Sequence, residues 1–368
     1  MKRCVRCLMP ETKPGITFDS DGLCAACTHS DAKKGINYEG RREHLQTLCD
    51  RFRRSDGYYD CLIPVSGGKD SMFQTWVMRE LYGMNPLLVC VTDNFDHTKA
   101  GAHNYWNIAE TFGCDMITLT LNPDFVRRMT RLSFEALGST NWAVDKAIYA
   151  WPIWEAIRRE IPLVVYGEDV TWEYGGVFGE ESSSAKRQIN NDVVKAAGEV
   201  LKDKVEDREW NMMSYPSEEQ IEAAGLEPIF LGYFFDWSDP AKVDIAKRHG
   251  MKTLQGEWDR AGYIEDYIQI DTVGYLMNYF LKYVKLGIGR ATDAAGYMIR
   301  EGTLTTVEAR ALIRTEDGKL DQRILDDFLR VTGYSIREFW AIIDKWWNEE
   351  VFERTTYGTW RMKDAARP

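Results

Sequence analysis

The sequence predicts an α/β protein whose core is a doubly wound, mostly parallel, five-stranded sheet, with a cysteine-rich element before it and a helical region after it. The sheet is predicted by short apolar runs that alternate with amphipathic segments. The runs are nearly continuous, as expected for strands covered on both faces, and their spacing favours right-handed strand–helix–strand crossovers. The predicted strands span 61–65, 87–92, 116–121, 163–166 and 229–235.

Helices are predicted where apolar residues recur at helical spacing. One such segment runs from Met72 to Leu81, and Gly83 follows it as a stop. The spacing is helical again from about 259 onward. Pro64 lies inside the first predicted strand, where it removes one ladder hydrogen bond, so we expect an irregularity at the end of that strand.

Three regions are predicted along the 368 residues, which exceed the usual size of one domain. Residues 1–55 form a cysteine-rich element and a linker helix. Residues 56–240 contain the sheet, with a polar helical insertion at about 180–225 that is either a mobile cover over the site or a static surface excursion. Residues 241–368 form the helical C-terminal region.

Composition excludes several classes of protein. The net charge of −11 argues against extensive nucleic-acid binding, which relies on Lys and Arg. No segment approaches the ~20 apolar residues of a membrane span, and the N-terminal residues lack the apolar core of a signal peptide. We therefore expect a cytoplasmic protein without a membrane span.

A structural zinc site is predicted at Cys4, Cys7, Cys24 and Cys27. The two Cys-x2-Cys pairs are separated by sixteen residues, and such pairs can place four thiolates tetrahedrally around one Zn2+. An iron–sulfur cluster and free thiols are the alternatives. Because four protein ligands leave no coordination place for a substrate, the expected role is in folding.

A glycine-rich loop follows the first predicted strand. Adjacent glycines bring successive N–H groups close to an anion, and the helix that follows adds the positive end of its dipole. Phosphate binding is therefore expected, with an ordinary glycine turn as the alternative; the spacing is not that of a Walker A motif. The loop consists of Val65, Ser66, Gly67, Gly68, Lys69, Asp70 and Ser71.

Polar residues also follow the second and fourth predicted strands. Ligands of such sheets bind outside the carboxyl ends of the strands, so Asp93 and Asn94 are expected to contact nucleotide or Mg2+, with turn caps as the alternative. After the fourth strand, carboxylates are candidate Mg2+ ligands, and Glu173 with Tyr174 is expected to orient a polar substrate; a surface turn is the alternative. The candidate ligands of this segment are Glu168 and Asp169.

The sequence Ser-Gly-Gly-Lys-Asp-Ser resembles the pyrophosphate loop (PP-loop) of enzymes that adenylate a carbonyl or amide oxygen, such as asparagine, GMP and NAD synthetases and tRNA thiolation enzymes. The resemblance implies an adenine-nucleotide α-hydrolase-like fold for 56–240 and cleavage of ATP between its α and β phosphates. It implies that the loop 65–71, Asp93, Asn94 and Gly167 bind ATP, that Lys69 offsets phosphate charge and that Asp70 helps to hold Mg2+.

The combination of motifs resembles the N-acetyl sugar amidotransferase family of bacterial lipopolysaccharide and O-antigen synthesis. The family implies that the acetamido oxygen of a nucleotide-linked sugar, with UDP as the expected carrier, attacks ATP and that ammonia then displaces AMP to give an acetamidino group. The run 268–271 departs from the pattern where a His is expected, so no substrate role is assigned to it. The matching segments are 3–7, 9–10, 14–19, 22–27, 63–71, 161–168, 173–176 and 289–293.

The resemblance also assigns roles and partners. ATP, Mg2+ and structural Zn2+ are the implied cofactors, with Glu173, Tyr174 and Arg290 at the substrate. A separate glutaminase and an ammonia-channelling barrel subunit, like the pair used in histidine biosynthesis, are the implied partners. The implied catalytic residues are Lys69, Asp70, Glu168, Asp169 and Glu173.

Two other functions are weighed against this one. A tRNA thiolation enzyme also combines a PP-loop with cysteine pairs, but it needs a basic face and catalytic cysteines near the nucleotide. In a noncatalytic zinc-ribbon scaffold, the glycine loop would have no function. Measurement of AMP release distinguishes the three functions. Stimulation by tRNA indicates a thiolation enzyme, stimulation by an acetamido sugar nucleotide indicates the amidotransferase, and stimulation by neither indicates a scaffold.

Overall fold

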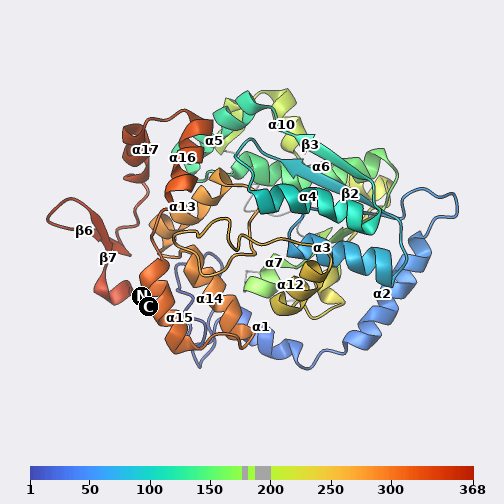
Figure 1. Cartoon of the computed structure of the whole chain (residues 1–368), viewed down its shortest axis with the longest axis horizontal. Helices are drawn as coiled ribbons and strands as arrows, with labels where there is room; N and C mark the ends of the chain where they lie inside the picture. The colour runs from blue at the N-terminus through green and yellow to red at the C-terminus, as the bar shows by residue number, and fades with distance from the viewer. Residues whose placement is uncertain (176–180, 187–199) are drawn as a thin grey trace.

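The computed structural model describes residues 1–175, 181–186 and 200–368 (Figure 1). Its centre is a five-stranded, all-parallel sheet with strand order β3-β2-β1-β4-β5, which confirms the predicted fold class. The order reverses between β1 and β4, and ligands bind at such a switch point. The strands are β1 Cys61–Pro64, β2 Pro86–Thr92, β3 Met116–Thr120, β4 Leu163–Tyr166 and β5 Glu227–Phe230.

Two details of the strands differ from, or refine, the expectation. The fifth strand was predicted over 229–235, but β5 ends at Phe230 and the chain turns through a 3-10 helix at Leu231–Tyr233. Pro64 is the last residue of β1 and pairs in register with Val89. Successive N–H groups of a strand point to opposite sides, and the Val65 N–H donates to Val89, so the N–H that Pro64 lacks lies on the β4 side.

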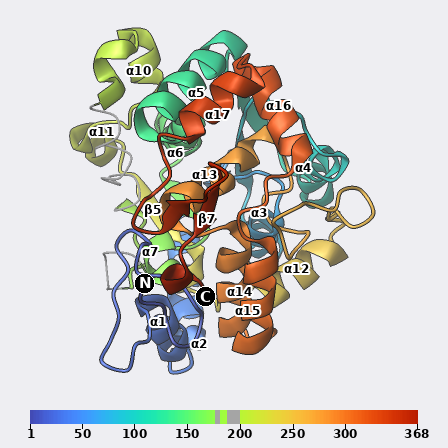
Figure 2. The same cartoon turned by 90° about the vertical axis from the view of Figure 1, so that its left-hand side faces the viewer.

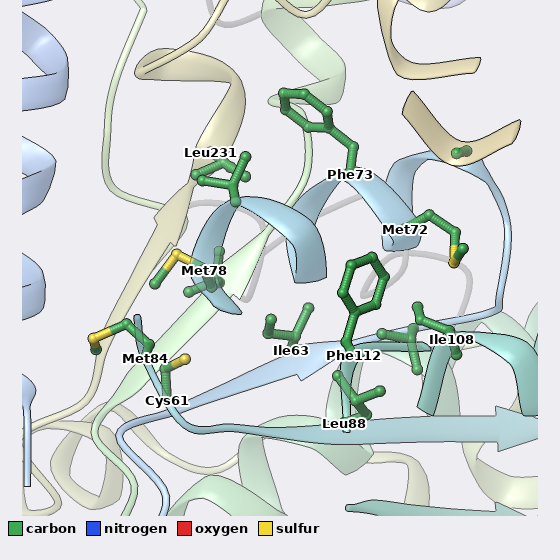
Figure 3. Packing of buried hydrophobic residues seen from close by; sticks show 14 of the residues in the cluster. Cys61, Ile63, Met72, Phe73, Met78, Met84, Leu88, Ile108, Phe112 and Leu231 are labelled. Carbon is green, nitrogen blue, oxygen red and sulfur yellow. The ribbon is translucent and has the colours of Figure 1, made fainter. Parts of the chain in front are cut away.

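Helices cover both faces of the sheet, and successive residues of β1 divide between the faces. Ile63 packs under α3 (Lys69–Trp76) and α4 (Lys99–Phe112), where Met72, Phe73 and Phe112 meet it (Figure 3). Leu62 points the other way, into the cluster below α6 (Trp142–Arg158). Burial of each such large apolar side chain contributes about 1.5–3 kcal/mol, which fixes the end of β1 and the loop that follows it.

The first face is completed by elements from distant parts of the chain. Helix α3 continues into a π-helical turn at Val77–Leu81, and α12 (Asp239–Arg248) packs beside α3. Helix α12 spans the boundary predicted at 240, and the three-region division stays a prediction. The cysteine-rich element leads into α1 (Ala25–Lys33) and α2 (Tyr38–Phe52).

After β4 the chain forms α7 (Val170–Tyr174). The predicted insertion at about 180–225 includes η2 (Lys202–Lys204), α10 (Asp207–Met213) and α11 (Glu218–Ala223). The rest of it lies partly outside the described residues, and its role as a cover stays a prediction.

The C-terminal region is mostly helical, as predicted, and it also contains an antiparallel pair of strands. Helices α5, α16 and α17 pack through Phe134, Phe328 and Phe339 (Figure 2). The Met1 amino group donates to the Ala365 carbonyl at 2.8 Å, which places the termini together. The elements are α5 Pro123–Leu137, η4 Gly274–Leu276, α13 Met277–Leu286, α14 Arg290–Arg300, α15 Thr306–Glu316, α16 Gln322–Thr332, α17 Ile336–Ile343, β6 Phe352–Arg354, β7 Trp360–Met362 and η5 Asp364–Ala366.

Among the described helices, none has both the length and the apolar character needed to cross a membrane.

Candidate active site

The glycine loop opens at the carboxyl end of the central strand β1, next to the switch point. Gly67 has φ +86°, and a Cβ there would lie 2.9 Å from the backbone of Asn104, so the turn requires glycine. The Ser66 N–H donates to Ser71 Oγ at 2.9 Å. Helix α3 begins after Gly68 without a side-chain cap, which leaves N–H groups of its first turn available to an anion.

A network of two lysines and two aspartates lies beside this loop. Lys69 Nζ is 2.6 Å from Asp70 and 3.1 Å from Asp239. Lys242 Nζ is 2.7 Å from Asp70 and 2.9 Å from Asp239, and only 2% of its side chain is exposed. Burial raises the pKa of Asp70, but Lys242 and Lys69 outweigh it and hold that pKa below its usual range. The two positive and two negative charges offset one another, which lowers the free-energy cost of burying them.

Glu168 and Gly167 lie close to this network. Burial, and then the charge of Asp70, raise the pKa of Glu168, while Lys242 and Lys69 lower it in part. The Tyr174 hydroxyl donates to Glu168 Oε1 at 3.2 Å. A Cβ at Gly167 would lie 2.9 Å from the Trp237 ring, so glycine lets β4 end against that indole.

A cavity of about 410 Å3, here called the loop cavity, extends from the glycine loop along the carboxyl edge of the sheet. Its walls come from the loop, the end of β2, α4, α6 and the segment 267–275. The run 268–271, to which no substrate role was assigned, is a wall of this cavity. The cavity is within the range of ~300–1,000 Å3 typical of ligand sites. Its polar lining includes Ser66, Lys69, Asp70, Asp93, Asp145 and Gln269.

The two residues predicted after β2 separate in the structure. Asp93 lines the loop cavity, and burial raises the pKa of its carboxyl to about 7, with the Phe95 N–H opposing the shift. Asn94 does not line the cavity, because its side-chain amide donates to the Leu121 carbonyl at 3.3 Å. Its predicted nucleotide contact thus finds no support in this geometry.

The predicted residues after β4 also divide. Asp169 caps α7 by accepting from the N–H groups of Thr171 and Trp172 at 2.9 and 3.3 Å, and it lines neither the loop cavity nor the second cavity described next. The capping explains why the structure does not bring it to Asp70. Glu173 pairs with Lys33 of α1.

Glu173 and Tyr174 line a second cavity of about 180 Å3, here called the α1 cavity, between α1, α7, α14 and the start of α12. Arg290, predicted at the substrate, lines neither cavity. It is 5% exposed and its Nε is 2.9 Å from Glu265.

Sequence reasoning missed Lys242 and Asp239. A weak signal was present, because Ser238-Asp239-Pro240 is a helix-start pattern that would put a lysine on the first turns of the helix. Nothing local indicates that this turn lies against the glycine loop.

The four N-terminal cysteines form a candidate metal centre. Their sulfur atoms all lie within 4.8 Å of one another and are buried, with 3.7 Å between Cys4 and Cys27 and 3.5 Å between Cys7 and Cys24. Tetrahedral thiolates at ~2.3 Å from one Zn2+ stand about 3.8 Å apart, so the residues fit a single ion. A cluster with a separate iron for each thiolate needs wider spacing.

The sheet, the glycine loop at its switch point and the lysine–aspartate network define the class: an α/β protein with a site suited to phosphate. Residues 261–367 match the family model described as "LPS biosynthesis protein WbpG-like, C-terminal domain". This part of the chain is similar to that family of domains, which agrees with the predicted resemblance to proteins of bacterial surface-polysaccharide synthesis. The matched region supplies the segment 267–275 of the loop cavity and the α14 wall of the α1 cavity.

Two individual proteins are also similar. The uncharacterized protein MJ1599 of Methanocaldococcus jannaschii is 28% identical over 115 residues, which span 31% of this chain and 40% of that protein. The solved U34-tRNA thiolase NcsA from Methanococcus maripaludis, with its 4Fe-4S cluster, is 10% identical, with 87% of this chain and 90% of that chain covered and a TM-score of 0.26. A TM-score this low supports no conclusion on fold or chemistry.

Proposed function

We propose that the protein is an ATP-dependent amidotransferase. It adenylates the acetamido oxygen of a nucleotide-linked N-acetyl sugar and replaces that oxygen with ammonia, giving an acetamidino sugar for surface polysaccharide with release of AMP and pyrophosphate. The match of residues 261–367 to a domain of LPS biosynthesis proteins supports a sugar substrate.

One observation carries the ATP part of the proposal. The uncapped first turn of α3 and Lys69 face a cavity of about 410 Å3, which combines an anion site with space for a nucleoside. Backbone N–H groups of the loop and the Lys69 ammonium would hold the β and γ phosphates. Asp70, with 34% of its side chain exposed, and Glu168 would hold Mg2+, which supplies charge neutralisation when bound.

The chain's task is to position charge where it develops. The acetamido oxygen bonds to the α phosphorus as the α–β phosphoanhydride bond breaks and pyrophosphate leaves, so that Lys69 and Lys242 stabilise the leaving group. Ammonia then bonds to the amide carbon, loses a proton and expels AMP. The proton passes to water, because Glu168 is assigned to Mg2+ in this proposal.

The remaining elements of the proposal concern cofactors and supply. The four cysteines would hold a structural Zn2+. Ammonia would come from a separate glutaminase with a channelling barrel subunit, and the reaction would take place in the cytoplasm, where ATP and nucleotide sugars are made.

Mass spectrometry tests the proposal. The full chain is incubated with ATP, Mg2+, isotopically labelled ammonium and a panel of UDP-linked N-acetyl sugars. The expected product has one amide oxygen replaced by labelled NH, and Asp70→Ala should not form it, whereas Asp244→Ala, an exposed change on α12, should. Absence of the product across the panel, with ATP left intact, would contradict the proposal.

A further inference from the structure

The α1 cavity is assembled from three distant parts of the chain. Helix α1 of the cysteine-rich element, α7 after β4 and α14 of the C-terminal domain all contribute walls. Sites for small molecules are often placed where such parts meet. Its volume of about 180 Å3 suits one sugar ring or a phosphate group rather than a whole nucleotide. Among its lining residues are Ser30, Lys33, Trp172, Trp237, Asp239 and Arg300.

An ion pair links this cavity to the loop cavity. Asp239 lines the α1 cavity, and it is 3.1 Å from the ammonium of Lys69, which lines the loop cavity. A second link is the hydrogen bond from Tyr174, in the α1 cavity, to Glu168. A ligand in the α1 cavity is therefore next to the groups proposed to act on ATP.

Several charges of the cavity are paired, but within the described residues Arg300, Asp236 and Glu301 are in no ion pair. Lys33 pairs with Glu173, and Asp239 pairs with Lys69 and Lys242. Among the described residues, the Arg300 guanidinium has no carboxylate within ion-pair distance and no hydrogen bond, and its one close ring contact is Tyr297 at 5.2 Å. The nearby thiols of the cysteine cluster act on it only electrostatically. An arginine of this kind presents a planar set of donors that matches an oxyanion.

Aromatic rings complete the lining. Trp172 stacks on His29 with centroids 3.9 Å apart and planes 8° from parallel. Within the described part of the chain, the indole N–H groups of Trp172 and Trp237 are buried without a hydrogen-bond partner, and Trp237 is 4% exposed. Of these two indoles, only the partly exposed ring of Trp172 offers the cavity a flat apolar face of the kind that packs against a sugar ring.

We propose that the α1 cavity is the acceptor site, and that Arg300 binds an oxyanion of the acceptor while Trp172 contacts the sugar ring. The inference rests on the proposed function, in which an acetamido oxygen must approach the α phosphate of ATP. The oxyanion is a phosphate of the nucleotide carrier or a carboxylate on the sugar.

Binding measurements without turnover test the assignment. The loop cavity is first saturated with α,β-methylene-ATP and Mg2+, and UDP and D-glucuronate are then titrated separately, by calorimetry and by ligand-observed NMR. Wild type should bind at least one of them, and the one that binds identifies the source of the oxyanion. Arg300→Gln should weaken that binding about tenfold or more, the loss expected for one charge-assisted contact, without changing affinity for the ATP analogue.

Two further variants keep the test decisive. Arg337→Gln, an exposed change on α17, should bind as wild type does. Ser30→Trp fills the cavity while Arg300 stays in the chain, and it should also block binding. Loss of bound metal in Arg300→Gln with unchanged ligand affinity would assign Arg300 to the cysteine cluster and overturn the inference, as would the absence of binding to either probe.

The outcomes also separate the two proposals. Arg300-dependent binding without amidine formation would leave the acceptor site standing and remove the proposed reaction. If wild type forms the amidine and Arg300→Gln binds the probes and turns over as wild type does, the proposed reaction stands and the acceptor-site assignment fails.

Discussion

Replacing Lys242 tests the buried charge network most sharply. Lys242→Met keeps the length of the side chain and removes one of two cations that face Asp70 and Asp239. Lys69 would then balance only one of the two carboxylates. Because both lysines hold the pKa of Asp70 below its usual range, that pKa should rise in the variant.

The expected loss follows from the geometry. Lys242 makes two contacts at 2.7 and 2.9 Å and is 2% exposed. Removing one partner of a fully buried pair costs about 3–5 kcal/mol, and we take about 3 kcal/mol because a third of Asp70 is exposed. With an unfolding entropy of about 2.1 cal/mol/K per residue over 368 residues, this lowers Tm by about 4 °C.

Differential scanning calorimetry and AMP release measure the two consequences. Lys247→Met, on the exposed side of the same helix, should change neither. Lys242→Met with Asp239→Asn restores the charge balance and should recover most of the Tm, but not the activity. A Lys242→Met protein with the Tm and the AMP release of the Lys247→Met control would refute the assigned role of the network.

Three other changes have defined outcomes. Gly67→Ala should weaken ATP binding about tenfold in calorimetry, because φ is +86° and the added Cβ meets a backbone carbon at 2.9 Å. The control is Gly57→Ala, where φ is +79° and nothing lies within 4 Å of the added Cβ. Equal ATP affinities of the two variants would contradict the role of the loop. Cys24→Ser should lose bound metal and soluble yield while Cys114→Ser keeps both, and a stable, metal-free, active Cys24→Ser protein would disprove a structural centre. The Asp93 carboxyl has a pKa of about 7 in the folded state against about 3.9 in the unfolded state, so the folded state binds more protons between these pH values. Wild type should therefore lose stability as pH rises through that window. The plot of Tm against pH should be flatter for Asp93→Asn, and parallel curves would be inconsistent with the raised pKa.

The sheet and the glycine loop could be predicted because their signals are local. Buried parallel strands require continuous apolar runs such as 61–65, and the turn at Gly67 admits no residue with a Cβ. The cysteine spacing is equally local. The same local reasoning extended the fifth strand past Phe230, since an apolar run does not distinguish a buried strand from the buried 3-10 turn at Leu231–Tyr233.

The rest of the site depends on tertiary contacts. Lys242 lies 172 positions from Asp70, and no periodicity indicates that α12 packs against α3. Arg290 carries a family motif but is buried against Glu265, and Asp169 has the right chemistry for a metal while its oxygen caps α7. Distinguishing a ligand from a cap or a buried ion pair requires the direction of the side chain, which sequence spacing does not contain.

The nucleotide products formed with an acetamido sugar nucleotide and ammonium test the central claim most directly. Chromatography of the reaction should show AMP and pyrophosphate in equal amounts with the amidine. Formation of ADP and phosphate would contradict attack at the α phosphorus, and with it the role assigned to the loop 65–71.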